Sequence, residues 1–355
     1  MSRALASAPP RVAGRWPAAA LALAALASVL VWQAVERLGA TRLHPRAYEM
    51  LAAAQTLQAA SRIIAAEKTA RGLMQPESVD PNRTGLIGPE YTPITTTVGE
   101  LPAKRSVANP DFAAALVRLI DSVGLPRGAP VVVILSGSFV GADIAAVAAV
   151  EALGLRPVLV VSLSASMFGA TDPDFNILDM LGLLRRRGVL QTRPELAVLG
   201  GEMGVASGME PEAVALLRLS AFREGAKLVS EPTLAGLVDR LVEQTQAALG
   251  PGVRPGLVIN VGGALVALGN CPQSYEMPPG LSRRPLACGQ GTPGLALRLA
   301  GDGRAPILHV INIRRMALEL GLPFDPVPLP RPGLNPAVYG TTATTNEKIR
   351  QGDMK

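Results

Sequence analysis

The sequence predicts an α/β fold, with an N-terminal transmembrane helix followed by a doubly wound, mostly parallel sheet that carries helices on both faces. Short runs of Val, Ile and Leu alternate with longer segments that have helical spacing, which is typical of parallel sheets. The runs at 131–135 and 158–162, joined by a helical segment at 142–153, have the form of one βαβ unit. An uncharged stretch of 19 residues, 17–35, precedes this pattern and has the length of a membrane span.

The N-terminal region predicts attachment to a membrane. Residues 1–16 form a basic tail with three arginines, and residues 17–35 form the expected transmembrane helix. By the positive-inside rule, the tail favours a cytoplasmic N-terminus and an extracytoplasmic body. We therefore expect a single-pass protein of the inner membrane, in contact with the lipid bilayer through residues 17–35. A signal peptide that is removed is the alternative.

Residues 36–109 are expected to form a membrane-proximal helix and an extended, proline-rich arm. Good helix formers dominate 44–72, whereas 75–110 contain six prolines and no sustained periodicity. The α/β domain spans 110–323 and begins with a helix before the first strand. Beyond the βαβ unit, the alternation predicts strands at 196–200, 226–230, 256–263 and 306–313, with helices at 210–224 and 233–248. Residues 271–295 are expected to form an irregular excursion from this domain. Residues 324–355 are expected to form a Pro-rich, polar C-terminal tail.

Composition and motifs exclude several classes of function. The net charge is +6, and no stripe of Lys and Arg with interleaved aromatic residues indicates a nucleic-acid partner. The glycine-rich turn after the first strand lacks the lysine of a P-loop and the third glycine of a dinucleotide fingerprint. No residues show the spacing of metal ligands. We therefore expect no nucleic acid, no cofactor and no metal.

Two cysteines, Cys271 and Cys288, both lie in the irregular excursion. An even count in an exported domain permits a disulfide between them. Two unpaired thiols are the alternative.

Serines follow both strands of the βαβ unit at the points where the strands end. Parallel neighbours bring these ends together, next to a helix N-terminus whose backbone N–H groups stabilise an anion. The sequence therefore predicts an anion-binding crevice at this edge of the sheet. Helix and strand capping by the same serines is the alternative. The residues expected to form the crevice are Ser136, Gly137, Ser138, Gly141, Ser164 and Ser166.

Two other segments are candidates for the same crevice. Asn260 ends a predicted strand, and Gly262 and Gly263 after it allow a close approach of the backbone to a ligand. Lys104 and Arg105 in the arm provide positive charge for an anion. For the two glycines, the alternative is a tight turn that needs glycine for its conformation alone. For Lys104 and Arg105, the alternative is a solvated pair of basic residues.

Catalysis by a serine nucleophile is the competing hypothesis for this edge. His309 is the only histidine in the α/β domain. If the strand at His309 lies beside the serine loops, three residues could form a catalytic triad. Ser138 would be the nucleophile, His309 the base, and Asp172 the carboxylate that orients the base. A structural histidine and a capping aspartate are the alternatives.

Three blocks of the sequence resemble a known family. They are GPEYTPITTTVGELPAKRSVANPDFAA (88–114), SGSFVGADIAAVAAVEALGLRPVLVVSLSASMFGATDPDFNILDM (136–180) and INVGGALVALG (259–269). Together they resemble the bacterial poly-gamma-glutamate system protein family, an accessory membrane protein of poly-γ-glutamate capsule synthesis and export. Typical members have SGSFPGLN in the serine loop, so Val140 and Asp143 depart from the family pattern.

The resemblance implies a process and a polymer, without an established reaction. Poly-γ-glutamate and the other membrane components of the capsule synthesis machinery would be the partners, in the bacterial cell envelope. Our first hypothesis is a membrane-anchored subunit that binds the polymer or assists its export. The alternative is a γ-glutamyl hydrolase or transferase with Ser138 as nucleophile. A sugar- or nucleotide-binding module of the same fold is a more remote third hypothesis.

Overall fold

The computed structural model divides the chain into two compact units, residues 1–42 and 43–355. The expected basic tail at 1–16 and the end of the expected C-terminal tail lie outside the described residues. The structure describes residues 17–39, 42–201, 204–284, 287–301 and 303–341.

The first unit contains helix α1 (Ala18–Gly39). Its apolar run extends from Ala18 only to Trp32 and is followed by Gln33, whereas a helix needs about 20 apolar residues to cross a bilayer. Among the described residues, no helix combines the length and the apolar character that a membrane span requires. The predicted transmembrane helix at 17–35 is therefore wrong, and so are the inner-membrane placement and the bilayer contact that were inferred from it.

A mixed seven-stranded sheet forms the centre of the second unit, with the strand order β5-β4-β3-β2-β6-β8-β7. All neighbours pair in parallel except β7 and β8, which are antiparallel. The strands are β2 (Pro130–Leu135), β3 (Arg156–Ser162), β4 (Leu196–Val198), β5 (Lys227–Leu228), β6 (Leu257–Val261), β7 (Gly280–Ser282) and β8 (Ile307–Val310).

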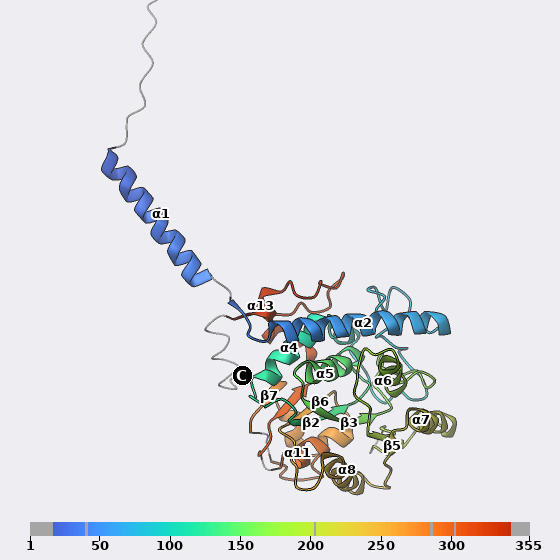
Figure 1. Cartoon of the computed structure of the whole chain (residues 1–355). Coiled ribbons are helices and arrows are strands. Elements are labelled where there is room, and N and C mark those ends of the chain that lie inside the picture. Colours follow the sequence, from blue (N-terminus) through green and yellow to red (C-terminus); the bar gives the residue numbers. More distant parts are fainter. Residues whose placement is uncertain (1–16, 40–41, 202–203, 285–286, 302, 342–355) are drawn as a thin grey trace, which may run out of the picture. The chain divides into compact units, whose positions relative to one another are not determined.

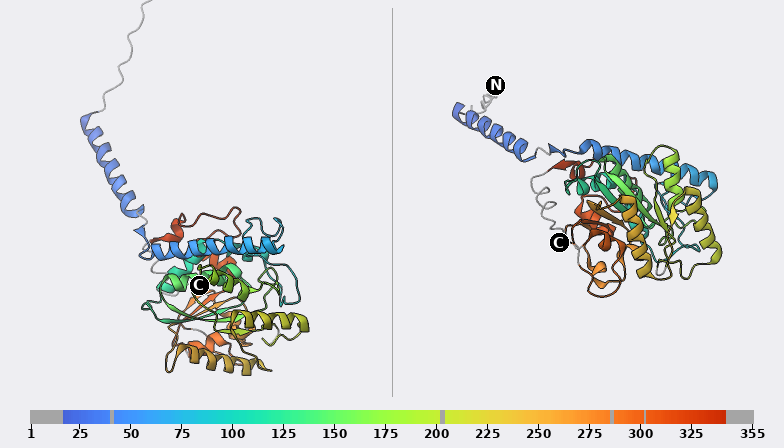
Figure 2. Two further views of the ribbon diagram at one scale, coloured as in Figure 1. Left: turned by 45° about the vertical axis from the view of Figure 1, so that its right-hand side comes forward. Right: turned by 60° about the horizontal axis from the view of Figure 1, so that its bottom comes forward.

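The central strands are buried on both faces, which explains their continuous Val, Ile and Leu sequences. In β2, Val131, Val133 and Leu135 belong to one hydrophobic core, and Val132 and Ile134 belong to the other. This alternation follows from the opposite directions of successive side chains in a strand. The sheet thus separates two layers of helices, which Figures 1 and 2 show above and below it.

The larger core packs against most of the helices. Its face of the sheet carries α2 (Ala47–Arg71), α3 (Leu101–Ser106), α4 (Asp111–Asp121), α5 (Val140–Ala152), α6 (Ile177–Arg186), α7 (Pro211–Glu224), α12 (Ile313–Glu319) and α13 (Pro336–Tyr339). The smaller core lies beneath α8 (Leu234–Leu249), α9 (Leu265–Leu268) and α11 (Leu295–Ala300).

The described residues of the irregular excursion and residues 324–341 pack as parts of this unit. The excursion contains α10 (Pro272–Glu276) and the antiparallel strand β7. Cys271 and Cys288, whose pairing the sequence left open, form a disulfide there. Residues 324–341 lie against the body, where the Tyr339 hydroxyl donates to Asp111 Oδ1 at 2.7 Å. Two short strands, β1 (Arg42–Leu43) and β9 (Gly340–Thr341), lie outside the main sheet.

The winding of the chain determines where a ligand can bind. From β2, the chain proceeds outward through β3, β4 and β5 on one side, and then returns to place β6 and β8 on the other. The direction of winding therefore reverses between β2 and β6. In open α/β sheets, ligands bind at the carboxyl ends of the strands beside such a reversal.

Candidate functional site

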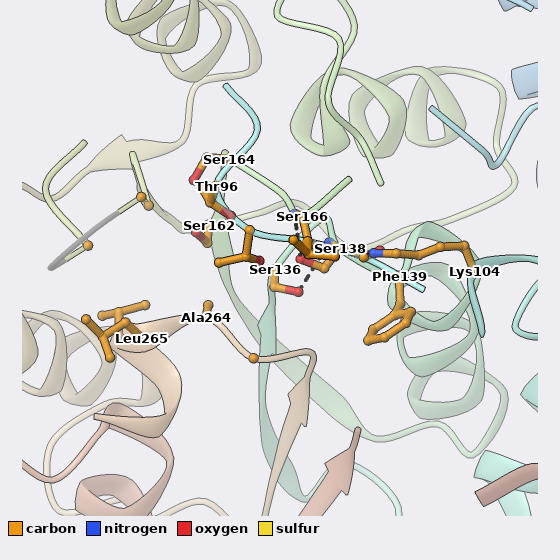
Figure 3. Close-up of a pocket in the computed structure, with 18 of the residues that line it drawn as sticks. Thr96, Lys104, Ser136, Ser138, Phe139, Ser162, Ser164, Ser166, Ala264 and Leu265 are labelled. Carbon is orange, nitrogen blue, oxygen red and sulfur yellow. Dashed lines mark hydrogen bonds between the residues drawn. The ribbon is translucent and has the colours of Figure 1, made fainter. Parts of the chain in front are cut away.

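A cleft of about 550 Å³ lies at the carboxyl ends of β2, β3, β4 and β6 (Figure 3). Five parts of the chain line it: the two serine loops after β2 and β3, a glycine turn after β4, the start of α9, and the arm at 96–100 with Lys104. The predicted crevice thus exists as a cavity. Its volume lies within the range of about 300–1,000 Å³ that is typical of small-molecule sites.

Serine hydroxyl groups form the polar wall of the cleft. Ser136 Oγ accepts the N–H of Ser138 at 3.2 Å, and Ser138 Oγ accepts the N–H of Ser166 at 3.2 Å. The first bond lies within the loop after β2, and the second connects this loop to the loop after β3. Ser164 differs, because its Oγ has no hydrogen-bond partner in the described part of the protein although the residue is only 4% exposed. A buried hydroxyl without a partner is costly unless a ligand or a solvent molecule completes it.

Two glycines leave the space that these hydroxyl groups occupy. A Cβ atom on Gly200 would lie 2.1 Å from Ser164 Oγ and 2.5 Å from Ser162 Oγ, and φ at Gly200 is +80°. A Cβ atom on Gly262 would lie 2.1 Å from Ser136 Oγ, with φ at +85°. Both positions therefore need glycine for the close approach as well as for the left-handed backbone.

Lys104 of α3 is the basic group of the cleft. Its Nζ lies 2.6 Å from Ser166 Oγ and donates to the carbonyl of Ser138. The ammonium group also lies 4.5 Å from the centre of the Phe139 ring. The side chain is buried, and this burial lowers the pKa of Lys104 to about 7, while the nearby Asp143 opposes the shift. Figure 3 shows Lys104 extending toward Ser138 and Ser166.

Asp143 of α5 is the buried acidic partner of Lys104. Complete burial raises the pKa of Asp143 to about 8, and the Ser136 N–H, Lys104 and the Gly137 N–H oppose this shift. Asp143 does not line the cleft. Asp143 therefore opposes the lowering of the Lys104 pKa from a position outside the lining of the cleft.

The arm at 96–100 forms a wall of the cleft that sequence reasoning missed. The N–H of Thr96 donates to the carbonyl of Ala165 at 2.8 Å, and the N–H of Met167 donates to the carbonyl of Thr97 at 2.9 Å. The arm thus runs along the loop after β3. Thr96 and Thr97 end a run of three threonines in one of the blocks that carry the family resemblance. This run was the available signal in the sequence. Other lining residues that were missed are Phe139, Ser162, Gly200, Gly201, Gly204, Ala264, Leu265 and Val266.

The structure brings part of the predicted binding set into the cleft. Predicted residues that line it are Lys104, Ser136, Ser138, Ser164, Ser166 and Gly263. Those that do not line it are Gly137, Gly141, Asn260, Gly262 and Arg105. Gly137 and Gly262 shape the ends of β2 and β6 with positive φ angles of 66° and 85°.

Arg105 and Gly141 have structural roles. Arg105 points away from the cleft, because successive residues of a helix are about 100° apart, and its Nε donates to Asp325 Oδ1 at 2.6 Å. A Cβ atom on Gly141 would lie 2.3 Å from the Val107 carbonyl oxygen. Gly141 therefore permits close packing of α5 and does not serve the approach of a ligand to the backbone.

Asn260 and His309 form a buried contact between β6 and β8. Asn260 Nδ2 donates to the Gly262 carbonyl at 3.0 Å and lies 3.2 Å from His309 Nδ1. Burial lowers the pKa of His309 to about 4, which keeps the imidazole neutral at pH 7. Neither side chain lines the cleft.

The hypothetical triad is not assembled. Asp172 Oδ1 accepts the N–H of Asp174 at 2.9 Å within a local turn, whereas the N-cap of α6 is Asn176. Among the described residues, no hydrogen bond joins Ser138, His309 and Asp172. His309 therefore does not serve as the base of Ser138 in this arrangement.

Within the described ranges, no group of three or more His, Cys, Asp or Glu residues could hold a metal ion. The polar groups of the cleft are mainly hydroxyl groups, one buried amine and glycine-rich backbone. Together these groups suit the recognition of a carboxylate.

Comparisons with protein-family models, with curated proteins and with solved structures found no match to this chain.

Proposed function

We propose that this protein is an accessory protein of poly-γ-glutamate capsule synthesis or export, and that its cleft binds the polymer through the carboxylate groups. The observation that carries the proposal is the convergence of five serines and Lys104 on one cleft. Other components of the capsule machinery would be its protein partners. The choice of poly-γ-glutamate as the ligand rests on the sequence resemblance.

The donors of the cleft match the needs of a carboxylate. Ser164 Oγ has no partner among the described residues, so its proton is available to a ligand. Lys104 adds a basic group, and hydrogen bonds that involve a charged group are stronger than neutral ones. Helix α5 begins at Val140, and its N-cap residue Phe139 lines the cleft. The positive end of the helix dipole therefore favours an anion at this place.

The shape of the site suits a segment of a longer chain. The cleft has a volume of about 550 Å³ and is bordered by residues from five separate parts of the chain. Glu100 at its border is paired with Arg314 at 2.8 Å, which offsets the repulsion that a free carboxylate would exert on a polyanion. A γ-linked glutamate chain presents one α-carboxylate per unit, so one unit in the cleft leaves its neighbours free to contact the border.

Calorimetric titration of the protein with poly-γ-glutamate tests this function. Poly-α-glutamate of the same length is the matched control, because it has the same charge and a different linkage. We expect tighter binding of the γ-linked polymer, with an affinity that falls as salt rises because the contacts are charged. Equal affinity for the two polymers would contradict recognition by this cleft and would indicate charge attraction alone.

A further inference from the structure

We propose that Ser166 and Lys104 form a catalytic dyad in the cleft, in which Ser166 Oγ attacks an amide carbonyl. The choice of a γ-linked glutamate amide as substrate rests on the proposed function. The assignment of nucleophile and base rests on the geometry of the site. It differs from the sequence-based hypothesis, in which Ser138 was the nucleophile and His309 was the base.

The geometry places a base within reach of a nucleophile that faces the cleft. Lys104 Nζ lies 2.6 Å from Ser166 Oγ, and the two residues are 62 positions apart in the sequence. A base must lie within about 2.6–3.2 Å of the proton that it removes. Ser166 also lines the cleft, with 8% of its surface exposed. Ser166 is thus a residue of the cleft wall whose hydroxyl group is paired with an amine.

The surroundings of Lys104 orient its lone pair. The Ser138 carbonyl accepts one N–H of the amine, and a carbonyl oxygen can only accept. The lone pair of the neutral amine can then face the Ser166 hydroxyl. Burial lowers the pKa of Lys104 to about 7, so a large fraction of the neutral form exists near neutral pH. The other titratable groups around it are Asp143 of α5, whose pKa is raised by burial, and Glu100, which is paired with Arg314.

The reaction balances with water as the only co-reactant. In the first half, the bond from Ser166 Oγ to the carbonyl carbon forms and the hydroxyl proton moves to Lys104 Nζ. The C–N bond then breaks, and the departing amine takes that proton. In the second half, a water molecule gives a proton to Lys104 and its oxygen bonds to the acyl carbon. The ester bond to Ser166 breaks, and Oγ regains the proton. Serine–lysine pairs perform this chemistry on unrelated folds.

Ser138 has no comparable activation. Its Oγ accepts the N–H of Ser166, and Lys104 contacts its carbonyl oxygen, which is not nucleophilic. If Lys104 were only a cation that holds the two loops together, neither serine would be reactive. Chemical reactivity of Ser166 therefore separates catalysis from a structural role.

A fluorophosphonate probe tests the dyad on the full chain without any polymer. An activated serine oxygen displaces fluoride from the phosphorus of the probe, and peptide mapping by mass spectrometry identifies the labelled residue. We expect one label, on Ser166, at a rate that rises as the pH increases through about 7. Ser166→Ala should lose the label, and Lys104→Met should slow labelling by about 100-fold or more.

Ser122→Ala and Lys227→Met are matched controls outside the cleft and should label at the wild-type rate. If Lys104→Met does not fold, the pH profile of the wild-type protein carries the test of the base. Absence of a label on folded wild-type protein, a label on Ser138, or a rate independent of pH would overturn the dyad. Polymer binding without labelling would leave the proposed function intact and refute the dyad. Labelling without polymer binding would support the dyad and refute the proposed ligand.

Discussion

Replacement of Ser164 by alanine should separate the stability of the protein from its ability to bind a carboxylate. Ser164 is buried in the wall of the cleft, and its Oγ has no hydrogen-bond partner in the described structure. Ser164→Ala removes this hydroxyl group and keeps the Cβ atom. The cavity that it creates is small, since only one oxygen is lost.

The expected changes in free energy have opposite signs. A buried hydroxyl without a partner costs about 1–3 kcal/mol, so its removal should leave the free energy of unfolding unchanged or raise it by up to about 1 kcal/mol. A hydrogen bond to a charged group contributes about 1.5–3 kcal/mol. The affinity for poly-γ-glutamate should therefore fall by about 10- to 150-fold.

Chemical denaturation and calorimetric titration of the same samples measure the two quantities. Ser274→Ala is the matched control, because Ser274 is also buried with an Oγ that has no partner in the described structure, and it lies outside the cleft. It should show the same small change in stability with wild-type binding. If Ser164→Ala lowers stability by more than about 1 kcal/mol, or leaves the affinity unchanged, the assignment of this hydroxyl to the ligand is refuted.

Three further predictions concern the rest of the fold. Gly141→Ala places a Cβ atom 2.3 Å from the Val107 carbonyl oxygen and should lower the free energy of unfolding by about 1–3 kcal/mol; an unchanged denaturation midpoint would contradict the packing role. Reduction of the Cys271–Cys288 disulfide opens a loop with a sequence separation of 17 and should cost about 3 kcal/mol, measured as the difference between denaturation curves with and without reductant. The pKa of His309 falls from 6.5 to about 4 on folding, so the unfolded chain binds the extra proton and the contribution of His309 to stability should decline as the pH falls from 6.5 to 4, by about 3 kcal/mol. The raised pKa of Asp143 acts in the opposite direction, so the measurement is the difference in stability between wild type and His309→Leu, which should change by this amount across the window; a difference that does not depend on pH would refute the assignment.

The α/β character and the location of the serine loops followed from local sequence. Buried parallel strands such as β2 have continuous apolar sequences, and the βαβ rule makes β2 and β3 parallel neighbours. The serine groups after these strands therefore had to lie at one edge of the sheet. The structure pairs Pro130 with Arg156 and continues in register to Leu135 and Val161.

The contacts that complete the cleft have no local signal. Lys104 and Ser166 are 62 residues apart, and the arm that carries Lys104 has no periodicity that would place it against the loop after β3. The same limit applies to His309, because the register of β6 and β8 pairs it with Asn260, and its Nδ1 lies against the Asn260 side chain.

The transmembrane prediction failed for a different reason. It depended on the length of one apolar run, and in the described part of α1 that run extends only from Ala18 to Trp32.

A pair of substitutions at Gly263 tests most directly whether this cleft binds the polymer. Gly263 lines the cleft, and a Cβ atom there would meet no other heavy atom within 4 Å. Gly263→Gln and Gly263→Glu should therefore both fold, with side chains of equal size in the cleft. In titrations with poly-γ-glutamate, Gly263→Glu should bind more weakly than Gly263→Gln by about 1 kcal/mol or more, which is at least about a 5-fold change in Kd. Wild-type affinity in both variants would show that the polymer does not occupy this cleft.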